Sequence, residues 1–295
     1  MNTSRSVVEI VPTHIVTEGG GFKVRRPFRM GKVMSPFLLI DEMGPVNYGP
    51  GEAVGAPWHP HRGFETVTYL LDGRMRHEDS AGNQGELNPG DVQWMTAGRG
   101  IIHCEEPHEE MLRDGGRTHG FQIWVNLPAS HKMMRPRYQE VPSSESPTVE
   151  KNGVWARVIA GECMGEESAI DTKIPISLIH VKMNSGSRLS QELESGLNGM
   201  IYVFGGEIEI ENETKVKISP VAFGVRAKQQ IKDGELGILS EGDVISIKSK
   251  SDSEFLILAG PELNEPISRY GPFVMNTREE IEQAFIDYRN GNFVG

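Results

Sequence analysis

The sequence predicts a mainly β protein that consists of two barrels of similar construction and one short helix near its C-terminal end. Three observations carry this prediction: strand-like runs recur along the chain, segments of the two halves resemble each other, and one stretch has the period of an amphipathic helix. The length of 295 residues also suits two domains of roughly 100 to 150 residues each.

The strand-like runs are rich in β-branched and aromatic residues, and Gly, Pro, Asn or Asp separates them at short intervals. Short, punctuated runs of this kind are typical of antiparallel sheets. They cover residues 65–71, 92–95, 121–127, 156–161, 176–183, 199–204, 207–211, 244–249 and 254–260.

Two internal echoes indicate that each half holds one copy of the same barrel. YLLDGRMRHED (69–79) aligns with YVFGGEIEIEN (202–212), and GELNPGDVQWM (85–95) aligns with GELGILSEGDVISI (234–247). The chain between the halves turns polar and rich in proline. We therefore predict a first barrel over residues 1–135, a connector over 136–153 and a second barrel over 154–295.

The predicted helix closes the second barrel at about residues 277–290. Thr277 and Glu280 have the spacing of a capping box, and Gly291 marks the end. The apolar stripe of this helix consists of Ile281, Ala284, Phe285 and Tyr288. We expect this stripe to pack against a barrel.

Charge and cysteine content restrict the class of protein. A formal net charge of −11 repels a phosphate backbone, which argues against direct binding to nucleic acid. No apolar run approaches the ~18 residues of a membrane-spanning helix, and the N-terminus lacks a signal-peptide core. Cys104 and Cys163 are predicted to be free thiols in a reducing compartment. We expect a cytoplasmic protein, which would also be nuclear in a eukaryotic source.

Two pairs of polar residues carry the chemistry that the sequence predicts. His59 and His61 are two residues apart, and so are His103 and Glu105. In an extended strand, residues i and i+2 point to the same face, so neighbouring strands would bring both pairs together. Glu65 has the same parity as His59 and His61 if the strand continues without a bulge.

Three imidazoles and a carboxylate form a set of ligands that suits iron(II). The same set accepts manganese, nickel, cobalt, copper or zinc. Four protein ligands leave two positions open around an octahedral metal, which oxygen or a bidentate substrate could occupy. A lone His-x-His is common by chance, and either histidine could instead form hydrogen bonds inside a core. The second pair, and the small residues Gly98 and Gly100 nearby, favour the metal site.

Three long segments of the chain resemble the pirin family, and the likeness runs nearly from end to end. They are HPHRGFETVTYLLDG (59–73), GDVQWMTAGRGIIHCE (90–105) and YGPFVMNTREEI (270–281). This resemblance implies two tandem cupin barrels, which are double-stranded β-helices of the jelly-roll type. It also implies an iron site in the first barrel, on the residues that match His59, His61, His103 and Glu105.

General cupin spacing and the resemblance to pirins select different carboxylates as the metal ligand. General cupin spacing would select Glu65, whereas pirin-like proteins use the carboxylate beside the last histidine, here Glu105. The resemblance therefore assigns Glu65 to the surroundings of the metal or to the substrate. In the second half, the internal echoes place Glu192, Glu194, Asn198, Phe255 and Ile257 at the corresponding positions. None is an imidazole, so we predict a second barrel without metal.

Two classes of function are compatible with this resemblance. Pirin-like proteins have quercetin 2,3-dioxygenase activity, in which a flavonol chelates the metal through its 3-hydroxy and 4-keto oxygens and dioxygen opens the heterocycle with release of carbon monoxide. Glu105 or Glu65 would then take the hydroxyl proton as general base. The alternative is a co-regulator without catalysis, in which the oxidation state of the metal changes affinity for a transcription factor or a metabolic enzyme.

A basic segment offers a surface for such a protein partner. KVRRPFRMGK contains five basic side chains and no acid, in a chain that is otherwise acidic. A solvated loop is the simpler interpretation of this charge, and a docking patch is the alternative. The basic residues are Lys23, Arg25, Arg26, Arg29 and Lys32.

Overall fold

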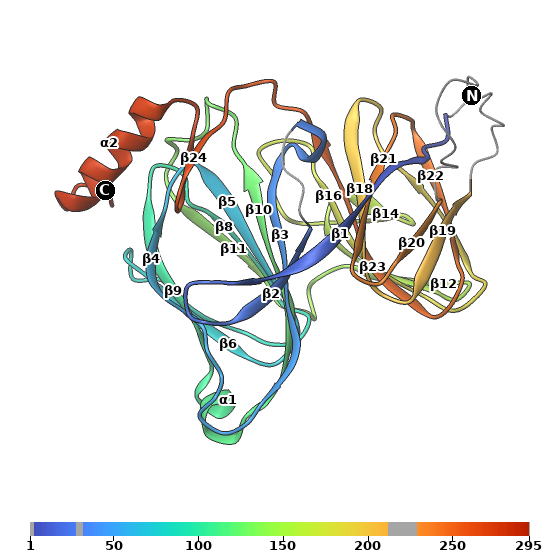
Figure 1. Cartoon of the computed structure of the whole chain (residues 1–295), viewed down its shortest axis with the longest axis horizontal. Coiled ribbons are helices and arrows are strands. Elements are labelled where there is room, and N and C mark those ends of the chain that lie inside the picture. Colours follow the sequence, from blue (N-terminus) through green and yellow to red (C-terminus); the bar gives the residue numbers. More distant parts are fainter. Residues whose placement is uncertain (1–2, 28–31, 212–228, 295) are drawn as a thin grey trace. The chain divides into compact units, whose positions relative to one another are not determined.

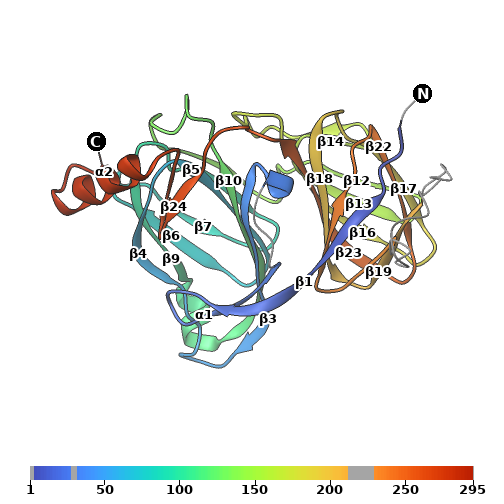
Figure 2. The ribbon, with the colours of Figure 1, turned by 45° about the horizontal axis from the view of Figure 1, so that its top comes forward.

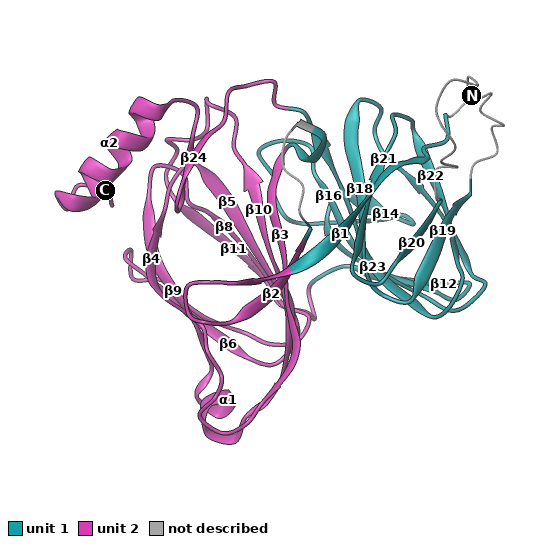
Figure 3. Cartoon of the chain, in the orientation of Figure 1, with its two compact units in different colours: residues 1–14, 27–35, 146–262 teal, residues 15–26, 36–145, 263–295 magenta. Residues whose placement is uncertain are grey.

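The computed structural model describes residues 3–27, 32–211 and 229–294 and is built mainly of β-strands (Figure 1). The chain forms two compact units, coloured separately in Figure 3. Unit 1 contains residues 1–14, 27–35 and 146–262, and unit 2 contains residues 15–26, 36–145 and 263–295.

Unit 2 contains two larger antiparallel sheets, with strand orders β11-β8-β5-β10-β3-β2 and β4-β9-β6-β7, and the two-stranded sheet β24-β25. Its strands are β2 (Lys23–Pro27), β3 (Phe37–Tyr48), β4 (Ala56–His61), β5 (Phe64–Asp72), β6 (Met75–Asp79), β7 (Gln84–Leu87), β8 (Val92–Thr96), β9 (Ile101–Pro107), β10 (Gly116–Asn126), β11 (Arg137–Val141), β24 (Ser268–Tyr270) and β25 (Phe273–Met275). Its helices are α1 (Glu109–Asp114) and α2 (Arg278–Arg289).

Unit 1 repeats this plan, with strand orders β1-β21-β18-β23-β16-β13-β12 and β17-β22-β19-β20. Its elements are β1 (Val7–Thr17), which begins in this unit, the 3₁₀-helix η1 (Lys32–Met34), β12 (Thr148–Lys151), β13 (Val154–Ala160), β14 (Glu162–Cys163), β15 (Glu166–Glu167), β16 (Ser177–Met183), β17 (Arg188–Glu192), β18 (Leu197–Gly205), β19 (Glu207–Glu211), β20 (Gln230–Lys232), β21 (Glu235–Leu239), β22 (Val244–Ser249) and β23 (Ser253–Pro261).

The barrel core of unit 1 follows from the two-residue period of its strands. In β19, with the sequence EIEIE, Ile208 and Ile210 are buried while the three glutamates are more exposed. The buried isoleucines join one apolar cluster with Ile245, Ile247 and Phe255. This unit therefore fills its interior with hydrocarbon.

The mainly β fold with a short C-terminal helix confirms the fold class that the sequence predicts. Every predicted strand-like run coincides with a strand, and Thr277 and Glu280 form the expected capping box. Several strands, among them β1 and β3, were not predicted; in β3, Gly44 and Pro45 interrupt the apolar pattern. The predicted connector 136–153 also contains the strands β11 and β12.

The compact units differ from the predicted division of the chain at 136–153. Helix α2 belongs to unit 2, where Ile281 and Ala284 pack against Phe273 and Phe293. Figure 2 shows the helix beside β24. The first residues of the chain belong instead to unit 1, because β1 pairs with β21. The N-terminal residues thus belong to the unit formed mainly by residues 146–262, and the C-terminal residues belong to the unit formed mainly by residues 36–145.

Strand pairing supports the first internal echo and corrects the second. Both copies of the first echo run from a strand of the larger sheet into a strand of the smaller one, β5 to β6 and β18 to β19. In the second echo, β8 pairs with β5, but β22 pairs with β17 and β19. The counterpart of β8 is therefore β21, and the counterpart of β9 is β22.

Within the described ranges, no helix is both long enough and apolar enough to cross a lipid bilayer.

Gly63, between β4 and β5, provides a test of the local packing. Its φ is +89°, and an added Cβ would lie 2.0 Å from the carbonyl oxygen of Val274. Gly82 has a φ of +86° and open space around it, so it shares the backbone strain without the clash. We expect Gly82→Ala to cost about 1 kcal/mol and Gly63→Ala on the order of 3–5 kcal/mol. Urea unfolding measures both, and equal losses would contradict the close packing at Gly63.

The pair of Glu254 and His180 in unit 1 predicts sensitivity to acid. His180 Nε2 and Lys182 Nζ each lie 2.9 Å from Glu254 Oε1. Burial by itself would raise the pKa of Glu254, but these contacts lower the pKa to about 2, against a usual value of 4.5. Burial also lowers the pKa of His180. The unfolded chain therefore binds more protons in acid, and stability is lost as the pH falls below the unfolded values.

We expect Glu254→Gln to lower the free energy of unfolding by about 1–2 kcal/mol at pH 7, with the difference from the native protein shrinking as the pH falls from about 4.5 to about 2. The matched control is Glu150→Gln, at an exposed position. Thermal unfolding across this pH range measures the effect. A difference that does not change with pH would contradict it.

Candidate metal centre

The pairing of β4 with β9 brings the predicted histidines together. The two strands are antiparallel, with His59 opposite His103 and His61 opposite Ile101. Directly opposite residues share one face of a sheet, and so do residues two apart along a strand. The three imidazoles therefore lie on the inner face.

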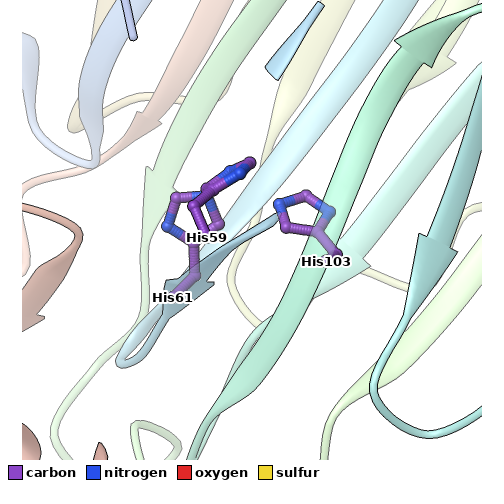
Figure 4. A group of neighbouring side chains, drawn as sticks. All are labelled: His59, His61 and His103. Carbon is purple, nitrogen blue, oxygen red and sulfur yellow. The ribbon is translucent and has the colours of Figure 1, made fainter. Parts of the chain in front are cut away.

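The ligand atoms of His59, His61 and His103 all lie within 4.8 Å of one another. Figure 4 shows the three rings turned toward a common point, two from β4 and one from β9. Within the described part of the chain, this is the one group of three or more His, Cys, Asp or Glu side chains with such geometry. The predicted three-histidine site is thus formed.

Backbone carbonyls determine which nitrogens face the common point. Nδ1 of His59 lies 2.7 Å from the carbonyl oxygen of Pro57, and Nδ1 of His61 lies 3.4 Å from that of Pro272. Because a carbonyl only accepts, Nδ1 carries the proton in each ring and Nε2 keeps its lone pair. The two Nε2 atoms are 3.0 Å apart. Two nitrogens that bind one metal at a right angle, each at about 2.1 Å, are separated by about this distance.

His103 gives the strongest indication that the group binds a cation. Its side chain is fully buried, and neither ring nitrogen has a hydrogen-bond partner among the residues that the structure describes. Burial lowers the pKa of His103 well below its usual value, and the nearby His61 and His59 lower it further. Burial and the neighbouring His59 do the same for the pKa of His61. Neutral imidazoles with free lone pairs are the form that binds a transition metal, so these residues fit one.

Glu105 lies close to this group but is not a member of it. The Thr68 hydroxyl lies 2.8 Å from Glu105 Oε1 and 2.7 Å from Gln122 Oε1, so its one proton is shared between two acceptors. Gln122 Nε2 donates to Glu105 Oε2 at 3.4 Å. The carboxylate is therefore held by side chains of β5 and β10, and it lines a cavity beside the imidazoles.

Glu65 lies apart from the imidazoles. The positive φ of Gly63 ends β4 before β5 begins, so the parity of His59 and His61 does not extend to Glu65. Its side chain is buried, and Thr96 Oγ1 donates to it at 2.6 Å. Of these two carboxylates, Glu105 lines the cavity and Glu65 does not.

The cavity beside the imidazoles has a volume of about 440 Å³, which is within the usual range of small-molecule sites. Its wall is apolar at Leu39, Met43 and Trp124, and Trp58 at its edge is half exposed. The polar lining includes Glu18, Lys23, Arg26, Asp41, Gln122 and Arg269.

A further buried histidine, His119, and the basic segment predicted as a loop or docking patch take other positions. Nε2 of His119 lies 2.9 Å from Glu42 Oε1, and His119 is not part of the three-histidine group. In the basic segment, Arg25 forms an ion pair with Glu42, and Arg26 forms ion pairs with Asp41 and Glu18. Arg29 and the side chain of Lys32 lie outside the described residues.

Thr68, Trp124 and Arg269 belong to the site but were not singled out from the sequence. Each comes from a different strand, and only the pairing of β10 with β5 and the return of the chain at β24 bring them together. For Thr68 and Trp124, the one available signal was their place within predicted strands, whereas Arg269 lies outside every predicted strand.

Unit 1 has different side chains where unit 2 carries the imidazoles. The counterpart of β9 is β22, in which Ile245 and Ile247 are buried in the apolar core. Across from them on β17 are Gln191 and Leu189. Phe255 and Ile257, which the second echo had aligned with His103 and Glu105, lie on β23 and pair with β16 and β18. Their earlier assignment is therefore corrected.

Fold and site together define a bicupin, a mainly β protein of two cupin domains, with three histidines that form a candidate metal site in one barrel. The family model described as Pirin matches residues 21–125, and that of the Pirin C-terminal cupin domain matches residues 178–294. The chain belongs to the pirin family.

Similar proteins cover the whole fold. The human protein named Pirin is 41% identical, over 98% of this chain and 94% of its own length. A crystal structure of quercetin 2,3-dioxygenase from Acinetobacter baumannii is 35% identical, covers 99% of both chains and has a TM-score of 0.89. The bacterial pirin YhhW from Escherichia coli, solved in complex with nickel(II), is 19% identical over 86% of this chain and 98% of its own, with a TM-score of 0.61.

We expect His103→Leu to weaken metal binding by more than about 100-fold, because two donors remain of the three. Leucine also removes two buried polar atoms without partners, so the metal-free variant should unfold at no lower temperature than the metal-free native protein. Anaerobic titration with iron(II) and thermal unfolding measure the two effects.

The matched control for this substitution is His131→Leu, in a turn outside the group. It should bind iron(II) as the native protein does. Native affinity in His103→Leu would show that the metal binds elsewhere.

Proposed function

We propose that this protein is a metal-dependent dioxygenase of the quercetin 2,3-dioxygenase type, with iron(II) on His59, His61 and His103 and with Glu105 as a fourth ligand. The observation that carries the proposal is the fully buried His103. Its two ring nitrogens have no hydrogen-bond partner among the described residues, and it lies beside the Nε2 lone pairs of His59 and His61. The related protein from Acinetobacter baumannii is named quercetin 2,3-dioxygenase, which supports the same reaction class.

Iron is the metal that suits oxygen chemistry among those that three imidazoles and a carboxylate accept. When bound, it would supply an electron-poor centre for the flavonol oxygens and a redox partner for dioxygen. The nickel(II) complex of YhhW supports the inference that a site of this kind also accepts metals other than iron.

The residues around the imidazoles have distinct tasks in this proposal. Leu39, Met43 and Trp124 exclude water and provide apolar contact for the flavonol rings. The buried carboxylate of Glu105, held by Thr68 and Gln122, accepts the proton of the 3-hydroxyl group. Glu65 is the alternative base, although it would have to act through Thr96, which donates to it.

Aerobic turnover of quercetin tests the proposal. The iron-loaded protein should open the ring with release of carbon monoxide, whereas His61→Ala and the metal-free protein should match the buffer. A loaded protein that also matches the buffer, with its iron content verified by elemental analysis, would exclude catalysis on flavonols.

The two carboxylates are separated by a matched pair of substitutions. We expect Glu105→Gln to lower kcat for quercetin by about 100-fold or more, because the amide cannot accept the proton. Glu65→Gln should change kcat by less than about 3-fold, since that carboxylate does not line the cavity. A larger loss of kcat in Glu65→Gln than in Glu105→Gln would instead assign the general base to Glu65.

A further inference from the structure

Arg269 of β24 lines the cavity as a cation that forms no ion pair with any described residue. Its guanidinium group lies 4.7 Å from the centre of the Trp124 ring. Its hydrogen bond among the described residues is a long one, 3.4 Å, to the carbonyl oxygen of Leu38. A guanidinium group has five N–H donors, so most of its donors remain for a ligand.

The acidic side chains of this wall are already paired. Asp41 accepts two hydrogen bonds of 2.6 Å from Arg26, and Glu18 also bonds to Arg26. The charge of Arg26 is therefore balanced by two carboxylates in direct contact. The charge of Arg269 interacts with the same carboxylates only over a longer distance. A partly desolvated cation without a contacting anion is unfavourable, and an anionic ligand would remove this cost.

Arg269 and two of the three histidines, His59 and His61, line the same cavity and meet at one indole ring. The Trp124 ring lies 5.3 Å from the ring of His61, and the guanidinium group of Arg269 contacts the same indole. Stacking on the indole orients the plane of the guanidinium group and leaves its edge free for a planar anion. A single small molecule could therefore reach both the metal and Arg269.

We propose that Arg269 binds a carboxylate of the substrate whose oxygens bind the metal on the three histidines. The natural substrate class is then an acid with a chelating pair of oxygens, such as a dihydroxylated aromatic acid, and a neutral flavonol occupies the same site without this contact. The proposal rests on the function proposed above and names the class of compound for its site.

Binding to the iron(II)-loaded protein under anaerobic conditions tests this inference. The probes are protocatechuate and the longer dihydrocaffeate, each compared with its own methyl ester, which keeps the chelating oxygens and removes the charge. We expect at least one acid to bind the native protein about 10-fold more tightly than its ester. Calorimetric titration measures the affinities.

Substitution of Arg269 should remove this preference for the acid. In Arg269→Gln, the acid and its ester should bind within about 2-fold of each other, and the affinity for the ester should stay near its native value. Arg269→Lys should keep part of the preference, because it keeps the charge without the planar fork. The matched control is Arg113→Gln, on the exposed surface of α1, which should leave the preference unchanged.

Three outcomes would overturn the inference. These are equal binding of acids and esters by the native protein, equal weakening of both in Arg269→Gln, and absence of binding by every probe. The last would exclude this class of substrate but not the metal site, because the protein in every titration is already loaded with iron(II). A preference for the acid in a protein that does not turn over quercetin would support the role of Arg269 and overturn only the proposed flavonol chemistry.

Discussion

The register between β4 and β9 is the constraint on which the candidate site depends. His59 lies opposite His103 because the strands pair in this register, and the two-residue period then adds His61 and turns Glu105 toward the same interior. A shift of one residue would move β9 side chains to the other face and break the group. The site is therefore a property of the pairing as much as of the histidines.

The C-terminal segment of the chain holds this register in place. Gly63 allows the backbone of Val274 to approach, and the backbone N–H of Val274 donates to the carbonyl oxygen of Arg62 at 3.0 Å. The Arg62 side chain is bound to Asp287 of α2 at 2.6 Å and lies over the ring of Phe293. The helix that closes the chain thus secures the end of β4, directly beside His61.

The cavity combines three environments that seldom occur together in an apolar interior. They are imidazoles whose Nδ1 protons point to backbone carbonyls, a wall of hydrocarbon and indole, and a guanidinium group that no carboxylate of the described residues contacts. Burial favours the neutral form of the imidazoles, and the same burial makes the unpaired cation unfavourable. Both effects favour a ligand that brings negatively charged oxygens to the metal centre and to Arg269.

The sequence by itself determined the mainly β fold, the capped helix at about residues 277–290 and the place of His59 and His61 on one face of a strand, because strand period and capping are local properties of the chain. Tertiary structure alone decided the rest. Glu65 departs from the imidazoles because Gly63 breaks the strand, and β22 is the counterpart of β9 because its partners are β17 and β19. Arg269 reaches the cavity from β24, more than a hundred residues from Trp124, through contacts that no local pattern encodes.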